Sequence, residues 1–202
     1  MLGNNFQTTL TILLPASILV NCFQLRNNLK NIDQHFYKNL ILFCLPEFYC
    51  TLSFQSREVN TNFIIGILLI IISLQSMVGS IQTGLRIILN YEKFYLVVMG
   101  ILHGLTNLGG SLLSGAVLSK NLPKNNKRAT IAISYCSMAC IQVLTLTTQT
   151  KFNTFLTKIL LYWVSAPIIF FLVEKYLYYS VDEKLYKKIS NFSFFNGVNN
   201  LN

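Results

Sequence analysis

Charged side chains are scarce in this sequence: Asp, Glu, Lys and Arg make up 11% of its 202 residues. Soluble domains of this size carry about 25%. The deficit extends along the whole chain and is not confined to one end, which argues against an ordinary soluble domain. The composition predicts an all-α integral membrane protein whose main partner is the lipid bilayer.

Sequence motifs for metal sites and for common hydrolases are also missing. The five cysteines form no CxxC pair and have no histidine at ligand spacing, so no metal and no cofactor are expected. Cys136 and Cys140 share a helix face and are interpreted as buried, unreacted thiols. Neither HExxH nor GxSxG occurs, so we expect no enzyme and no catalytic residues.

Acidic residues are few, and the net charge is +9. In a soluble protein that balance would suggest nucleic acid as a partner. Here most of the Lys and Arg lie in short loops between apolar runs, and nucleic-acid-binding motifs are absent. The basic residues are therefore interpreted as determinants of membrane topology, and no nucleic acid is expected.

Six apolar segments are candidates for crossing a bilayer, which takes about 20 apolar residues. They are residues 10–25, 40–54, 63–78, 94–119, 129–148 and 155–178. The fourth is unusual, because its stretch HGLTNLGGSLLSG contains four glycines and five polar side chains. As one helix it would extend about 39 Å. Split between Asn107 and Gly110, it gives two arms that each reach the middle of the bilayer and return.

The distribution of Lys and Arg favours the split arrangement. If all six segments cross, the two sides of the membrane carry 9 and 7 basic residues; if the fourth segment returns to its own side, they carry 13 and 3. The second distribution follows the positive-inside rule, with the N-terminus outside and the C-terminus cytoplasmic. We thus expect one transmembrane domain over residues 1–180, a re-entrant segment at 94–119 and a polar cytoplasmic tail at 181–202.

A helix break inside a membrane predicts a binding site. Non-helical backbone at that depth needs protein or water to satisfy its polar groups. The second arm would present unpaired N–H groups and the positive end of its dipole, which attract anions. The candidate substrate-binding residues are His103, Thr106, Asn107, Gly109, Gly110 and Ser111.

Simpler structural roles are open for several of these residues. His103 is equally consistent with a packing role, and Thr106 with a hydrogen bond to its own helix. The Gly100 and Gly104 pair is typical of close helix packing. Gln142, in the fifth segment, could line the cavity or join helices.

Two charged residues outside the break are further candidates. Glu47 lies in the short second segment beside Pro46, where a carboxylate is costly, so it is a candidate for proton coupling; the alternative is a polar crevice or the interface. Arg128 precedes the fifth segment and is a candidate for attracting anions; the alternative is an anchor at the cytoplasmic surface.

The sequence GILHGLTNLGGSLLSGAVLSKNLPKNNKRATIAISYCSMACIQVLTL, residues 100–146, resembles the second-repeat motif of the TauE/SafE sulfite exporter family of permeases. Residues 8–20 resemble the corresponding helix of the first repeat. The resemblance implies a polytopic bundle with inverted-repeat halves in the bacterial inner membrane. It also implies transport of small anions, including sulfur oxyanions and organosulfur compounds.

The Gly-rich hairpin of the first repeat has no counterpart in the sequence, and no apolar run occupies the place of a last helix. We therefore expect about five crossing helices and one Gly-broken re-entrant hairpin. The predicted function is a permease for small, sulfur-containing anions that works by alternating access. The alternative is a non-transporting remnant or the assembly partner of a split permease, so the expected protein partner is a second copy or a chain supplying the missing half.

Overall fold

The computed structural model describes residues 6–26, 28–54, 66, 90–107, 109–149 and 156–174, and the regular elements in these ranges are all helices. The predicted helical class is confirmed for this part of the chain. No helix in these ranges combines the length and apolarity that a bilayer crossing requires. The predicted segment at 63–78, apart from Gly66, and the predicted tail at 181–202 lie outside the described residues.

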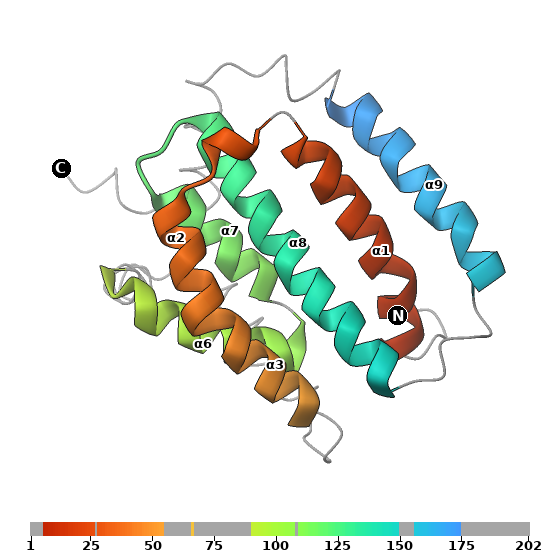
Figure 1. Cartoon of the computed structure of the whole chain (residues 1–202), viewed down its shortest axis with the longest axis horizontal. Coiled ribbons are helices and arrows are strands. Elements are labelled where there is room, and N and C mark those ends of the chain that lie inside the picture. The colour runs from red at the N-terminus through yellow and green to blue at the C-terminus, as the bar shows by residue number, and fades with distance from the viewer. Residues whose placement is uncertain are drawn as a thin grey trace.

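Three helices form one side of the structure. Helix α1 (Phe6–Leu25) lies between α8 (Lys124–Gln149) and α9 (Leu156–Val173), and it contacts both (Figure 1). The other side of α8 contacts α3 (Leu45–Phe54) and α7 (Gly109–Ser119). Helix α8 is therefore the central element, shared by the two halves of the bundle.

The second predicted segment is longer than its apolar run. The Asp33 carboxylate accepts a hydrogen bond from the N–H of Phe36 and caps α2 (Gln34–Asn39). The chain then continues through a π-helical turn, η2 (Leu40–Cys44), directly into α3. The predicted start at residue 40 was wrong, because a capped polar turn precedes the apolar residues. The wide turn lies just before Pro46, whose nitrogen has no hydrogen to donate to a carbonyl of the preceding turn.

The fourth predicted segment is broken where the sequence indicated. Helix α6 (Glu92–Thr106) ends at Asn107, and α7 begins at Gly109. Asn107 has φ 57° and ψ 14°, and its N–H donates to the carbonyl of His103 at 2.8 Å. Among the described residues it is the one non-glycine with positive φ. Asparagine tolerates this left-handed backbone better than most residues, so it ends the helix.

The two arms then fold back on each other as a hairpin. The Tyr95 hydroxyl donates to the carbonyl of Leu112 at 2.7 Å, which ties α6 to α7. At the open end, Lys120 Nζ lies 2.6 Å from Glu92 Oε2 and 3.2 Å from Asp33 Oδ2. The start and the end of the segment therefore meet at the same ion cluster, which also includes the loop before α2.

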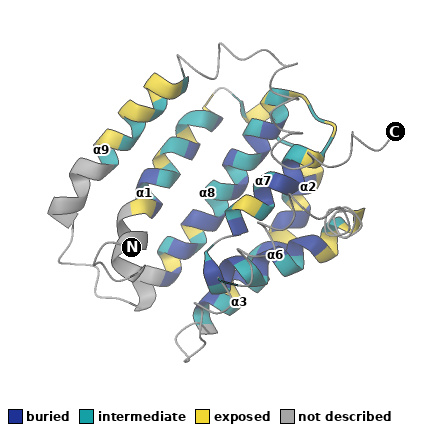
Figure 2. Cartoon of the chain, turned by 180° about the vertical axis from the view of Figure 1, so that it is seen from behind, coloured by how far each residue is buried: buried dark blue, intermediate teal, exposed yellow. Residues whose placement is uncertain are grey.

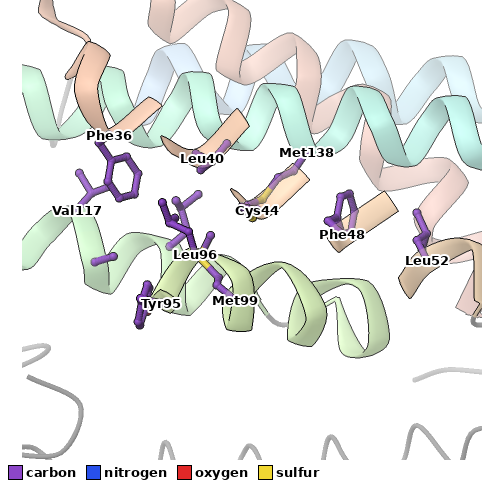
Figure 3. Close-up of a cluster of buried hydrophobic side chains, with 12 residues drawn as sticks. Phe36, Leu40, Cys44, Phe48, Leu52, Tyr95, Leu96, Met99, Val117 and Met138 are labelled. Atoms are coloured by element: carbon purple, nitrogen blue, oxygen red, sulfur yellow. The ribbon is translucent and has the colours of Figure 1, made fainter. Parts of the chain in front are cut away.

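A single apolar cluster fills the space between this hairpin and the α2–α3 helix. Residues spaced four apart along α2, η2 and α3 form one stripe, as helical periodicity requires: Phe36, Leu40, Cys44, Phe48 and Leu52 (Figure 3). Leu96 and Met99 of α6 and Val117 of α7 pack against the stripe. This packing fixes the hairpin to the rest of the bundle.

Glycines at two positions allow α6 to approach this stripe closely. A Cβ at Gly100 would lie 2.4 Å from the carbonyl oxygen of Cys44, and one at Gly104 would lie 3.0 Å from that of Phe48. At Gly100 the backbones are too close for any side chain, and a Cβ at Gly104 would in addition overlap the Thr51 side chain. The packing interpretation of this glycine pair is thus confirmed.

We predict that Gly100→Ala destabilises the fold by about 1–3 kcal/mol, because the added methyl group would overlap a backbone carbonyl that cannot rotate away. The thermal unfolding midpoint of the purified protein measures this change. Gly66→Ala is the control, since a Cβ there meets no atom of the described residues within 4 Å. Equal midpoints for the two variants would contradict the close approach.

The ion cluster predicts a pH dependence of stability. Burial favours the neutral form of Asp33, but hydrogen bonds from the Phe36 N–H and Lys120 lower its pKa below the ordinary 3.8. A lowered pKa stabilises the fold above about pH 3.8, and this contribution is lost as the pH falls through the folded-state pKa. Asp33→Asn keeps the cap but removes the charge. We expect it to cost about 1–2 kcal/mol near neutral pH and little at about pH 2. A difference that persists at low pH in denaturant unfolding would contradict this explanation.

Candidate functional site

A cavity of about 200 Å³ lies where the break between α6 and α7 faces α1 and α8. Ten residues line it: Leu13, Leu14, Ser17, His103, Asn107, Gly110, Tyr135, Met138, Ala139 and Gln142. Three of the six predicted substrate-binding residues are among them, namely His103, Asn107 and Gly110. The break thus supplies part of the wall, and two distant helices supply the rest.

His103 is the most deeply buried polar side chain of the wall apart from Gln142, with 7% of its surface exposed. Its ring packs on the ring of Phe48 with a centroid separation of 4.7 Å. On the other side, a Cβ at Gly109 would lie 2.4 Å from the His103 Cβ, so only glycine fits there. Within the described part of the chain, His103 Nδ1 has no hydrogen-bond partner. A buried polar atom without a partner is costly, and a bound molecule could satisfy it.

The break is connected to α8 by side-chain hydrogen bonds. Gln142 Nε2 donates to Asn107 Oδ1 at 3.2 Å, so the turn residue is held from the facing helix. Gln142 is only 2% exposed. The two roles considered for Gln142, lining the cavity and joining helices, are both observed.

Tyr135 holds the first turn of α7 in the same way. Its hydroxyl donates to the carbonyl of Gly110 at 2.5 Å and lies 3.2 Å from Ser114 Oγ. A Cβ at Gly110 would be 2.6 Å from that hydroxyl oxygen, so glycine is required for this contact. The N-terminal turn of α7, whose N–H groups have no partners within the helix, is thereby fixed at the cavity wall.

The other three predicted residues do not line the cavity. Thr106 is buried, and its hydroxyl donates to the carbonyl of Leu102 at 2.7 Å, as the structural alternative proposed. Gly109 packs against the His103 side chain, which a Cβ at this position would overlap. Ser111 is exposed and is not among the lining residues.

Glu47 and Arg128 also lie away from the cavity wall. Glu47 is half-buried in the first turn of α3, and its carbonyl accepts a hydrogen bond from the Thr51 hydroxyl. The Arg128 guanidinium forms an ion pair with Glu174 and lies over the ring of Phe170. Arg128 therefore joins α8 to the end of α9.

The residues that sequence reasoning missed come from α1 and α8. On α8 these are Tyr135, Met138 and Ala139, which share one helix face with Gln142 because each lies three, four or seven residues from it. The small or polar residues on that face were the available signal. Ser17 has the same spacing relative to Leu13 and Leu14 on α1, but nothing in the sequence indicated that these helices face the break.

No Lys, Arg, Asp or Glu is among the ten described residues of the wall. Any negative charge inside would be stabilised by hydrogen bonds from neutral groups and by the dipole of α7. Leu13, Leu14 and Met138 give the remaining wall an apolar character. In the described ranges, no group of three or more His, Cys, Asp or Glu side chains could hold a metal ion.

Comparison with known proteins gives no assignment: no family model, no curated protein and no solved structure matches this chain.

Proposed function

We propose that this chain is an integral membrane permease for small anions, with the broken segment at 94–119 as a re-entrant hairpin and the cavity at its turn as the substrate site. The substrates are small sulfur-containing anions, such as sulfite or short organosulfonates, as the resemblance to the TauE/SafE family implies. Transport proceeds by alternating access around the cavity. The protein lies in the bacterial inner membrane with its C-terminus in the cytoplasm.

The distribution of polar and apolar side chains supports a lipid environment. Large apolar side chains are exposed on α9, including Ile168, Ile169 and Phe171 at 57%, 59% and 49% (Figure 2). By contrast, polar residues such as Ser134 and Gln142 of α8 are almost fully buried. Soluble proteins rarely expose contiguous apolar surface of this kind. An apolar outer face is stable in contact with lipid, and polar groups of the interior find hydrogen-bond partners within the protein.

The topology proposed from the basic residues agrees with the hairpin geometry. A segment that enters and leaves on one side must bring its ends together, and the contact between Glu92 and Lys120 does so. The break also lies at the opposite end of the hairpin from this ion pair. This arrangement supports a turn at depth in the bilayer, with the charged ends at the cytoplasmic surface.

The observation that carries the anion proposal is the buried His103 beside the α7 N-terminus. Its Nδ1 has no partner among the described residues, and His103 lines the cavity. The first turn of α7 adds the positive end of a helix dipole at the same place. Together they offer hydrogen bonds to one small anionic group.

His103→Leu should reduce uptake of radiolabelled sulfite into proteoliposomes by about 10- to 100-fold, which corresponds to loss of one hydrogen bond to a charged group. The unfolding midpoint should stay unchanged or rise, because the substitution removes a buried atom that had no partner. If His103 has only a packing role, uptake should stay near the wild-type level and the unfolding midpoint should fall.

The matched control is His35→Leu, which changes the other histidine. The His35 side chain is 82% exposed and lies at the open end of the hairpin, away from the cavity. Its uptake should equal that of the wild type. Normal uptake by His103→Leu, or equal losses in both variants, would refute the assignment of the site.

A further inference from the structure

Three of the five cysteines meet at the interface between α1 and α8. Cys22 lies on α1, and its Sγ is 3.9 Å from the Sγ of Cys136 on α8. Cys140, one turn further along α8, contacts the same Cys136 thiol. All three are free thiols, and Cys22 and Cys140 are exposed while Cys136 is half-buried. The expectation that Cys136 and Cys140 are buried thiols of no further consequence was therefore wrong in its first part.

This thiol cluster lies beside the cavity. Cys136 follows Tyr135, which lines the wall, and Cys22 is five residues beyond Ser17 on the α1 side of the same wall. A covalent bond between Cys22 and Cys136 would join the two helices that supply seven of the ten lining residues. It would limit any separation of these helices.

We propose that Cys22 and Cys136 form an oxidisable dithiol, which a hydroperoxide converts into a disulfide that joins α1 to α8. The thiolate of the exposed Cys22 attacks one oxygen of hydrogen peroxide, which breaks the O–O bond and gives a sulfenic acid and hydroxide. The hydroxide takes up the proton that the Cys22 thiol released and becomes water. The Cys136 sulfur then attacks the sulfenic sulfur and expels a second water. Two thiols lose two electrons in total, and hydrogen peroxide accepts them.

The geometry requires only a modest movement for this reaction. The sulfur atoms must approach from 3.9 Å to the bonded distance of about 2.05 Å. The helices that carry the two cysteines are already in extensive contact. Cys136 is the partner rather than Cys140, because the Sγ of Cys22 contacts the Sγ of Cys136. The proposal does not depend on transport, so it can fail while the proposed function stands.

The test treats the purified full-length protein with hydrogen peroxide and maps its disulfides by mass spectrometry of unreduced peptides. Expected is one cross-linked pair, Cys22 with Cys136, and the loss of two of the five thiols in a maleimide mobility assay. Cys140→Ser should form the same bond. Cys22→Ser and Cys136→Ser should not form it.

Cys50 is the internal reference, because it is exposed on α3 and is not part of the cluster formed by the three thiols described above. Its free thiol should persist at the peroxide dose that closes the pair. Retention of all five thiols, a bond between Cys22 and Cys140, or oxidation of Cys50 before Cys22 would each overturn the proposal.

Discussion

The left-handed backbone at Asn107 determines where the chain reverses, and the cavity exists because of that reversal. Asn107 ends α6 through its hydrogen bond to His103, and α7 then returns alongside α6. Gln142 and Tyr135 of α8 bond to the two sides of the turn, so the break is held from outside as well as by its own backbone. Glycines 109 and 110 fit between these contacts, where any Cβ would overlap a side chain. The site is thus a consequence of how the turn is packed.

The same arrangement separates polar from apolar surface. Buried polar groups gather along α8 and at the break, whereas the exposed residues described on α9 are apolar apart from Ser165. Within the hairpin, the charged side chains lie at its open end, where Lys120 contacts Glu92 of α6 and Asp33 of the loop before α2. One end of the hairpin therefore carries charge and the other end carries neutral hydrogen-bonding groups. This polarity is what a re-entrant segment needs if its turn is to lie in an apolar medium.

Local chemistry explains which features the sequence predicted. Adjacent glycines beside Asn107 weaken a helix, so the break was predictable, and so was the packing of Gly100 and Gly104. Features that depend on distant residues were not predictable from the sequence. The partner of Arg128 is Glu174, 46 residues away, and the thiol contact joins Cys22 to Cys136 across 114 residues. Six of the ten residues of the cavity wall were missed for the same reason, because the apolar pattern of α1 and α8 does not specify which face meets the break. Helix α2 was missed because most of its residues are polar and its start depends on a cap from Asp33.

The central claim is that residues 94–119 enter and leave the membrane on its cytoplasmic side. Single cysteines at Tyr91 and Asn121, both exposed and flanking the hairpin, test it in a background without the native cysteines. A membrane-impermeant maleimide should label both from the cytoplasmic face of sealed vesicles and label a cysteine at Lys151 only from the opposite face. Labelling of Tyr91→Cys and Asn121→Cys from opposite faces, or absence of the protein from the vesicle membrane, would contradict the account.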